Sequence, residues 1–508
     1  MAINSSSADG RTMRASAAAK TPTVALPAAP AKAAASTLRT PDLCVIGAGS
    51  GGLSVAAAAA ALGVSVVLIE KHKMGGDCLN TGCVPSKALI AAARRAHEMR
   101  TSAAFGVTAK DVTVDFSAVQ AHIQRVIAAI APNDSVERFT ALGVEVIQAA
   151  GRFIDRQTVD AGDVLVRARR FVIATGSSPA IPAIPGLDSV PYFTNESIFN
   201  ISEPVGHLIV IGGGPVGLEL AQAHRRLGAK VTVLESATAL AKDDPELSAV
   251  AIHALRAEGV DIREGSKVAS VNGGPGMVSV RADSGAGVAS LNGTHLLIAT
   301  GRKPNIDGLG LEAAGITSDA RGIKVSDGLV TSNRRVFAIG DVTGGLQFTH
   351  VANAHAGIVI RRALFRLPAK VQLGQVPWVT FTDPEVAQVG LPEADARARG
   401  GKIVVYRWPF HENDRAQAER TPHGLVKVVC TPNGRILGAG IAGAHAGELI
   451  QIWSLAIAQG LKIDAMTAWI APYPTLGEVS KRAAFISLAA KARQPRVRNL
   501  LSFLRKFG

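Results

Sequence analysis

Cysteine is scarce in this chain of 508 residues: there are four, at positions 44, 78, 83 and 430. So few cysteines argue against a secreted domain held together by disulfides. A structural zinc site usually takes four protein ligands, and Cys44 and Cys430 lie far from the other two, each inside a strand-like apolar run. The distance of Cys44 and Cys430 from the other two cysteines thus argues against a four-cysteine zinc site. The scarcity of cysteine favours the cytoplasm as the expected compartment.

Acidic residues are nearly absent from the two ends, although the net charge is +14. Residues 1–40 contain five Lys/Arg and one Asp, and residues 481–508 contain eight Lys/Arg and no acid. The body is thus nearly neutral, so the charge does not indicate nucleic-acid binding. We interpret the C-terminus as a solvated basic tail, with attraction to a membrane surface as the less favoured alternative.

The first 40 residues lack the apolar segment of a secretory signal. Their composition, rich in Ala, Ser, Thr and Pro, fits either an organellar transit peptide or a disordered extension. A convincing membrane span is also missing. Residues 43–69 carry no charge, but five of these 27 residues are glycines and Gly63 interrupts the apolar run. The segment around Gly212 repeats this pattern with charges in its helix, so a βαβ unit explains both copies.

Two glycine fingerprints each lie between an apolar strand and a helix, in LCVIGAGSGGLSVA and LIVIGGGPVGLELA. Their glycines are Gly47, Gly49 and Gly52 in the first, and Gly212, Gly214 and Gly217 in the second. Each next strand ends in an acid, Glu70 or Glu235, 23 residues after the first glycine. Such a turn lets backbone approach a pyrophosphate at a helix N-terminus, and the acid accepts a bond from a ribose hydroxyl. The sequence predicts two dinucleotide sites.

Cys78 and Cys83 lie in GGDCLNTGCVPSK, before an apolar helical run. A helix N-terminus lowers a thiol pKa, and two close thiols can store two electrons as a dithiol/disulfide couple. Part of a zinc site and an inert structural disulfide are the alternatives for the pair taken by itself.

These motifs together resemble the pyridine nucleotide–disulfide oxidoreductases, over roughly residues 41–490. The resemblance also rests on ATGSSP at 174–179, ATGRKPN at 299–305, FAIGDV at 337–342 and VTFTDPEVAQVGL at 379–391. It implies an enzyme that binds FAD and a nicotinamide nucleotide, works as a homodimer, and passes a hydride through the flavin to a redox disulfide. The further cofactor-binding residues that it implies are Thr175, Gly176, Gly301, Gly340, Asp341 and Ala352. No metal site is expected.

The resemblance implies roles for the residues near the cysteines. Cys83 would face the flavin and Cys78 would exchange with substrate. Lys87 would lie near the flavin, paired with Glu219. Glu235 favours NAD(H) over NADP(H), because a carboxylate at this strand end repels a 2′-phosphate.

One position departs from the dithiol-specific members of the family. Those enzymes carry a His-Pro-x-x-x-Glu run, whereas this chain has Tyr473, with Glu478 at the same spacing. A phenol titrates near 10 and is a poor general base, but it can donate a hydrogen bond. Mercuric reductases share this tyrosine. The chain shows neither their C-terminal cysteine pair nor their N-terminal metal-binding domain, so the substrate need not be mercury.

The expected fold is α/β, with two Rossmann-like domains and an α+β C-terminal interface domain. The expected segments are a tail at 1–40, an FAD domain at 41–200 and 325–369, a nucleotide domain at 201–324, an interface domain at 370–490 and a basic tail at 491–508. The predicted function is a mercuric-reductase-like NAD(P)H:disulfide oxidoreductase. The alternatives are dihydrolipoyl dehydrogenase, and a quinone or dioxygen oxidoreductase with a regulatory disulfide.

Overall fold

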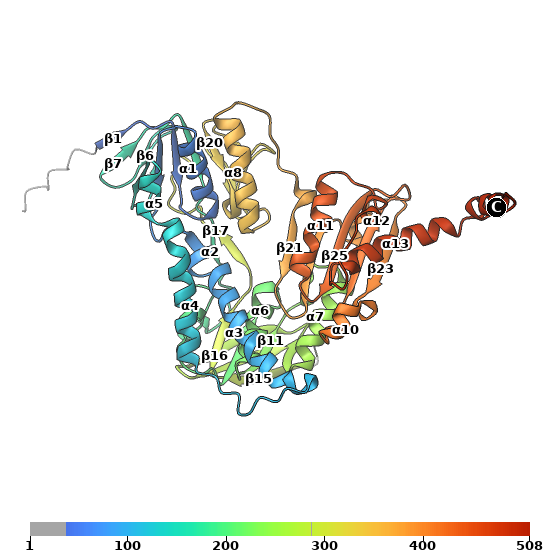
Figure 1. Cartoon of the computed structure of the whole chain (residues 1–508). Helices are drawn as coiled ribbons and strands as arrows, with labels where there is room; N and C mark the ends of the chain where they lie inside the picture. Colours follow the sequence, from blue (N-terminus) through green and yellow to red (C-terminus); the bar gives the residue numbers. More distant parts are fainter. Residues whose placement is uncertain (1–36, 286, 508) are drawn as a thin grey trace, which may run out of the picture.

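The computed structural model describes residues 37–285 and 287–507, in which three lobes are each built on a β-sheet (Figure 1). The first and second lobes contain parallel sheets, and the third contains an antiparallel sheet. The predicted α/β fold with two Rossmann-like units and an α+β C-terminal unit is confirmed.

The first lobe has a five-stranded parallel sheet in the order β20-β8-β2-β3-β4. Its strands are β20 (Val336–Ala338), β8 (Arg170–Ile173), β2 (Leu43–Ile46), β3 (Val66–Ile69) and β4 (Val144–Ile147). The residues of β2 and β3 are all buried, which explains their continuous apolar runs. Helices α1 (Ser50–Ala61) and α8 (Thr349–Ala363) pack against each other beside this sheet.

A short strand precedes the expected start of the folded chain at residue 41. Strand β1 (Thr37–Arg39) pairs in parallel with β7 (Val164–Val166) in a small sheet with β5 (Arg152–Phe153) and β6 (Val159–Asp160). Phe153 and Val166 share a buried cluster with Ile46, so the small sheet packs on the first lobe. The fold therefore includes residues 37–40, which we had expected in the tail; the rest of that tail lies outside the described residues.

The second lobe has a four-stranded parallel sheet in the order β12-β11-β10-β16 and a three-stranded antiparallel sheet. The parallel strands are β12 (Val260–Arg263), β11 (Lys230–Leu234), β10 (His207–Ile211) and β16 (His295–Ile298). The antiparallel strands are β13 (Lys267–Gly274), β14 (Met277–Asp283) and β15 (Val288–Gly293). Helix α6 (Pro215–Arg226) joins β10 to β11, and α7 (Pro245–Ala257) joins β11 to β12.

The third lobe has a five-stranded antiparallel sheet in the order β21-β22-β25-β24-β23. Its strands are β21 (Pro377–Thr380), β22 (Glu385–Gly390), β25 (Ile436–Gly443), β24 (Leu425–Cys430) and β23 (Val404–Pro409). Helices α11 (Ala446–Ala458) and α13 (Glu478–Ala492) pack on it around the buried Trp453. The segment expected as a basic tail is instead the end of α13 followed by another helix, α14 (Pro495–Leu504).

Three helices connect the first two lobes. Helix α2 (Gly76–Asn80) and helix α3 (Cys83–Thr101) follow β3, and α3 packs against α4 (Phe116–Ile130) and α6. Leu89 of α3 and Ile123 of α4 share one core with Leu218 of α6. The helices after the first nucleotide fold are thus fixed against the second. None of the helices in the described ranges is long and apolar enough to cross a membrane.

Candidate active site

The segment with the cysteine pair is held against the first glycine fingerprint. The Gly75 N–H donates to the Ala48 carbonyl oxygen over 2.9 Å. Gly76 has a φ of 57°, and a Cβ on it would lie 2.7 Å from the Gly49 Cα. Only a residue without a side chain allows this approach. Cys78 then lies in α2, and Cys83 is the first residue of α3.

The two thiols have opposite electrostatic environments. Both cysteines are free thiols, Cys83 exposed and Cys78 partly buried. A hydrogen bond from Cys78 lowers the pKa of Cys83 to about 6, helped by the Thr349 hydroxyl and the charge of Lys87. The Thr349 Oγ1 lies 3.6 Å from the Cys83 Sγ. The hydrogen bond to Cys83 raises the pKa of Cys78, and burial adds to the effect. Cys83 is therefore the thiolate of the pair.

Lys87 lies one helical turn after Cys83 and meets Glu219 of α6, as the sequence predicted. Its Nζ donates to the Glu219 Oε2 over 2.8 Å and lies 4.2 Å from the centre of the Phe381 ring. Glu219 is only 7% exposed, and its Oε1 accepts from the Phe381 N–H over 2.9 Å. The pair joins the cysteine helix to the second lobe and to the end of β21.

A polar network that the sequence did not reveal connects α2 to the Gly340–Asp341 turn. The Arg302 guanidinium lies 3.2 Å from the Asp77 Oδ2 and 3.8 Å from the Asp341 Oδ2. The Ser177 hydroxyl donates to Asp341 over 2.5 Å and accepts from the Arg302 Nε over 2.7 Å. Burial raises the pKa of Asp341, although Ser177 and Arg302 act against it. These residues are far apart in the sequence, so no local sequence pattern predicts the contacts between them.

The two fingerprints have the same geometry. Gly47 has a φ of 105° and Gly212 a φ of 113°, and a Cβ on either would overlap the carbonyl oxygen of Ala174 or Ala299. A Cβ on Gly52 or Gly217 would overlap the carbonyl oxygen of the first glycine of its own fingerprint. The middle glycines, Gly49 and Gly214, have no atom within 4 Å of such a Cβ.

The acid at each strand end binds its own fingerprint. The Glu70 Oε2 accepts from the Ala48 N–H over 2.6 Å, and the Glu235 Oε2 accepts from the Gly213 N–H over 2.7 Å. Each glutamate also accepts a bond from the N–H two residues after it. Both carboxylates thus lie beside the turn where a bound nucleotide's ribose is expected.

The ATGSSP and ATGRKPN segments lie side by side. Strands β9 (Ser177–Pro179) and β17 (Arg302–Pro304) pair, and the Thr175 hydroxyl donates to the Asn305 carbonyl oxygen over 2.8 Å. Gly176 accepts from the Asn305 N–H over 3.0 Å, and Gly301 has a φ of 117°. The Ala352 methyl group lies 3.2 Å from where a Cβ on Gly340 would be, so α8 fits closely under the Gly340–Asp341 turn.

These residues fit two dinucleotides. Helix α1 begins after Gly49 and α6 after Gly214, and neither has a side chain that caps its first N–H groups. Uncapped amides next to open space are suited to a pyrophosphate. The first site lies beside the cysteine segment and Asp341, which matches an FAD site, and the second lies in the second lobe. Among the described residues no group of three or more His, Cys, Asp and Glu side chains could hold a metal ion.

Tyr473 and Glu478 lie in the third lobe. Tyr473 is 70% exposed, and its hydroxyl donates to the Asp414 Oδ2 over 2.8 Å. That hydrogen bond raises the pKa of Tyr473. Glu478 is the first residue of α13. Neither residue is a polar partner of Cys78 or Cys83 within the described chain, so one subunit does not bring the predicted site together.

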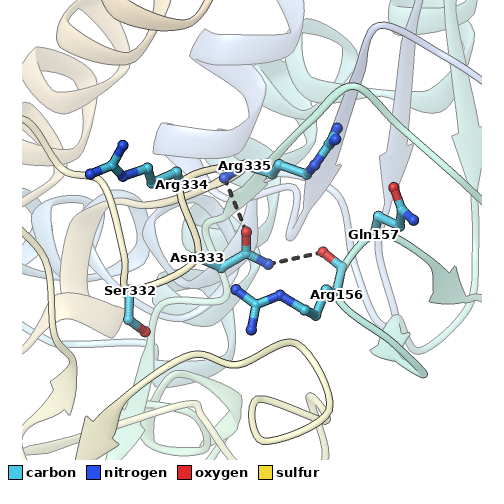
Figure 2. Close-up of a pocket in the computed structure, with 6 residues that line it drawn as sticks. All are labelled: Arg156, Gln157, Ser332, Asn333, Arg334 and Arg335. Atoms are coloured by element: carbon cyan, nitrogen blue, oxygen red, sulfur yellow. Dashed lines mark hydrogen bonds between the residues drawn. The ribbon is translucent and has the colours of Figure 1, made fainter.

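A separate hollow of about 500 Å³ lies on the first lobe. Figure 2 shows its lining, which comes from Arg156, Gln157, Ser332, Asn333, Arg334 and Arg335. Asn333 fixes the shape, because its Nδ2 donates to the Arg156 carbonyl oxygen over 2.9 Å. In Figure 2 the Arg335 side chain extends to the right and the Arg334 and Arg156 side chains extend to the left, so the three guanidinium groups end apart from one another. None of the predicted site residues lines this hollow.

Two matches to protein families cover most of the chain. Residues 41–356 match the family described as pyridine nucleotide-disulphide oxidoreductase. Residues 376–484 match the dimerisation domain of the same family.

Individual relatives span the whole of this region. A mercuric reductase of Streptomyces lividans is 35% identical over 461 residues, covering 89% of this chain and 97% of that protein. A dihydrolipoyl dehydrogenase of Geobacillus stearothermophilus is 35% identical over 456 residues, covering 88% and 96%. A Cu(II) complex of the HOCl-induced flavoprotein disulfide reductase RclA from Escherichia coli is similar in structure, with a TM-score of 0.79, 27% identity and coverage of 88% and 99%.

Proposed function

The chain belongs to the pyridine nucleotide–disulphide oxidoreductase family, and on that premise we propose how its residues perform the reaction. The protein is an FAD- and pyridine-nucleotide-dependent oxidoreductase, mercuric-reductase-like, that acts on a sulfur group or on Hg(II). We assign its redox disulfide to Cys78 and Cys83. The observation that carries this assignment is geometric: the segment with Cys78 in α2 and Cys83 at the start of α3 is held against the first fingerprint, with the Thr349 Oγ1 3.6 Å from the Cys83 Sγ. The lowered pKa of Cys83 and the raised pKa of Cys78 agree with it.

The difference in pKa between the two thiols gives the two sulfur atoms different roles. With Cys83 as the thiolate, oxidation of the reduced pair to a disulfide releases two electrons and the one proton of Cys78, and reduction takes up the equivalent of one hydride. FAD, when bound, supplies the hydride chemistry that links the nicotinamide to this couple. Cys83 holds the thiolate, stabilised by Cys78, Thr349 and Lys87. Cys78 keeps its proton and presents a neutral thiol to the substrate.

The Cys78 proton must leave when this sulfur reacts with an electron acceptor, and this requirement favours a soft metal ion over a disulfide. Tyr473, with a raised pKa, is a poor acceptor for that proton. A soft metal ion needs no such base, because it binds thiolate sulfur and displaces the proton itself. We therefore place Hg(II) or a similar thiophilic ion first among the substrates. Lipoamide, a disulfide that the reduced pair could reduce, is the second candidate, since a dihydrolipoyl dehydrogenase is also 35% identical to the chain.

A panel of electron acceptors tests this proposal. Reduced nicotinamide nucleotide should support turnover with Hg²⁺, and Cys78→Ala should abolish it. Cys430→Ala is the matched control, because Cys430 is buried in the third lobe and should be dispensable. Turnover with Hg²⁺ that survives Cys78→Ala would refute the assignment. Faster turnover with lipoamide would assign the substrate to the disulfide class, and quinone turnover that is the same without either cysteine would favour a regulatory disulfide.

We propose NAD(H) as the preferred nucleotide. Glu235 lies where the ribose of the bound nucleotide is expected. Arg225 and Arg226, the nearest arginines on α6, bind other groups of the protein. The Arg225 Nε donates to the Glu258 carbonyl oxygen over 2.8 Å. Arg226 is buried between the carboxylates of Glu258 and Asp383, at 2.6 Å and 3.0 Å. Neither guanidinium is therefore free to bind a 2′-phosphate.

The ratio of kcat/KM for NADH and NADPH tests the preference. Wild type should favour NADH, and Glu235→Ala should narrow the ratio by roughly tenfold, the value of one charged hydrogen bond. Arg225→Ala is the control and should leave the ratio unchanged. A wild-type preference for NADPH would contradict the proposal.

We also propose that the enzyme is a two-fold dimer with shared active sites. The family's dimerisation domain is present, and Tyr473 is exposed and apart from the cysteines of its own chain. A closed two-fold arrangement would supply Tyr473 of the partner subunit to each cysteine pair. Its hydroxyl would then donate to a sulfur-bound or metal-bound species there.

A further inference from the structure

The C-terminal helix α14 lies outside the region shared with the family. The match to the dimerisation domain ends at residue 484, whereas α14 spans Pro495–Leu504 and begins with a proline at its first turn, where proline favours a new helix. None of its residues is buried. Figure 1 shows it projecting from the third lobe beyond α13. The helix is therefore accessible on all sides within one chain.

One face of α14 is apolar and uncovered. Val497, Leu500, Leu501 and Leu504 follow the i, i+3, i+4, i+7 spacing of a single helix face. Leu500 is 55% and Leu504 is 50% exposed, and Phe507 just beyond the helix is 73% exposed. Phe503 and Phe507 stack edge to face, with ring centres 5.0 Å apart. The apolar stripe thus continues past the end of the helix.

The segment also carries four basic residues. Arg496, Arg498, Arg505 and Lys506 form no ion pair among the described residues, and no acid occurs after Glu478. A segment with unpaired cations beside an apolar stripe offers two kinds of contact at once. A partner that satisfies both must present negative charge over an apolar interior.

We propose that α14 binds the surface of an anionic lipid bilayer and attaches the enzyme to it. Ten residues of helix are about 15 Å long, too short to cross a bilayer of about 30 Å. A basic amphipathic helix with Leu and Phe on one face lies in the interface instead. Its apolar side chains enter the acyl boundary, and the arginines reach the headgroup phosphates.

Two other partners fit less well. A second copy of α14 would cover the apolar stripe but would leave the cations of both copies without negative partners. Nucleic acid would use the cations but leave Leu500 and Leu504 in water. An anionic lipid surface would contact both the apolar stripe and the basic residues of α14. Binding of α14 to such a surface is independent of which substrate the enzyme reduces.

Vesicle flotation of the full-length holoenzyme tests the proposal. Wild type should float with equimolar phosphatidylcholine/phosphatidylglycerol vesicles and stay behind with pure phosphatidylcholine. The double variant Arg498→Gln/Arg505→Gln should bind roughly 25-fold more weakly, at about fivefold per charge. Leu500→Ser/Leu504→Ser should weaken binding by roughly tenfold or more. Turnover in solution should be unchanged in both, because neither pair touches the candidate active site.

The matched control is Met277→Ser, which removes an exposed apolar side chain from β14 and should float like wild type. Wild type that fails to float would overturn the proposal, as would variants that all float equally. A leucine variant that becomes monomeric by light scattering would assign the face to a second copy. Binding of duplex DNA that is insensitive to the leucine pair, together with absent flotation, would assign the segment to nucleic acid.

Discussion

At Cys83, three neighbours act on one sulfur atom. The Cys78 thiol donates to it, the Thr349 hydroxyl lies 3.6 Å away, and Lys87 adds a positive charge one helical turn later. Partial desolvation of the sulfur opposes them, yet the pKa of Cys83 falls to about 6. At neutral pH the reduced pair therefore carries a single negative charge, and it resides on Cys83. A bound flavin would contact this thiolate, and an alkylating reagent would react with it.

Alkylation of the reduced holoenzyme by iodoacetamide should follow this ionisation. The rate at Cys83 should rise with pH with a midpoint near 6, because the thiolate is the reactive form. Cys78→Ala should shift the midpoint upward the most, since the hydrogen bond from Cys78 is the largest cause, and Thr349→Val should shift it less. Peptide mapping of the labelled cysteine gives the measurement. A midpoint unmoved in Cys78→Ala would contradict the electrostatic account.

The residue-scale site was only partly visible in the sequence. The cysteines, Lys87 and the glycines belong to short local runs, and the family resemblance paired Lys87 with the distant Glu219. Thr349 gave no signal, because it reaches Cys83 across 266 positions of chain. The Asp77–Arg302 contact was hidden for the same reason. Proximity of this kind exists only after the lobes have folded.

At the scale of elements, the two βαβ units use the three glycines of their fingerprints in the same way. In each unit the first and last glycines are required by the fold itself, because a Cβ there would overlap backbone. The middle glycine is different, since Gly49 and Gly214 face open space. Their lack of a side chain therefore serves the ligand and not the fold.

A matched pair of substitutions tests this distinction. Gly49→Ala and Gly214→Ala should both leave the thermal stability of the apoprotein nearly unchanged. Gly49→Ala should reduce the amount of FAD that copurifies with the protein. Gly214→Ala should retain FAD and raise the KM for NADH, because each methyl group would occupy the space of one pyrophosphate. The same loss of FAD in both variants would show that the two units do not bind separate nucleotides.

The elements also differ in how well the sequence predicted them. The buried strands β2 and β10 are continuous apolar runs and were evident. Strand β1 was missed, because three residues that pair with β7 have no periodicity of their own. Helix α14 differs from the solvated tail that the charge of the segment predicts, because the leucine spacing within the segment favours a helix.

At the scale of the whole molecule, the predicted site is divided between two places. The cysteine pair lies between the first and second lobes, and the Tyr473–Glu478 run lies at the surface of the third. The Asp414 carboxylate accepts from Tyr473 and orients its hydroxyl. This division makes the dimer a functional requirement of the proposed site and not only a matter of stability.

Complementation between two inactive chains tests the shared site. Cys78→Ala removes the exchange thiol, and Tyr473→Phe removes the hydroxyl that would serve the other subunit. Each variant alone should be inactive or nearly so. Coexpressed chains should form heterodimers in which one of the two sites is intact, and each heterodimer should have about half the activity of a wild-type dimer. Purified heterodimers without activity, or a fully active monomer, would rule out sharing.

The central claim is that Cys83 is the thiolate beside the flavin and Cys78 the thiol that meets substrate. Anaerobic reduction of the FAD-loaded enzyme by two electrons, followed by its long-wavelength absorbance, tests it most directly. In wild type the two electrons reduce the disulfide and leave the flavin oxidised, so we expect the charge-transfer band of a thiolate against the flavin. Cys78→Ala has no disulfide, so its Cys83 thiolate should show the band before any reduction, at a pH above the raised Cys83 midpoint, and Cys83→Ser should lack the band in either state. A full band in Cys83→Ser, or no band in oxidised Cys78→Ala at that pH, would contradict the account.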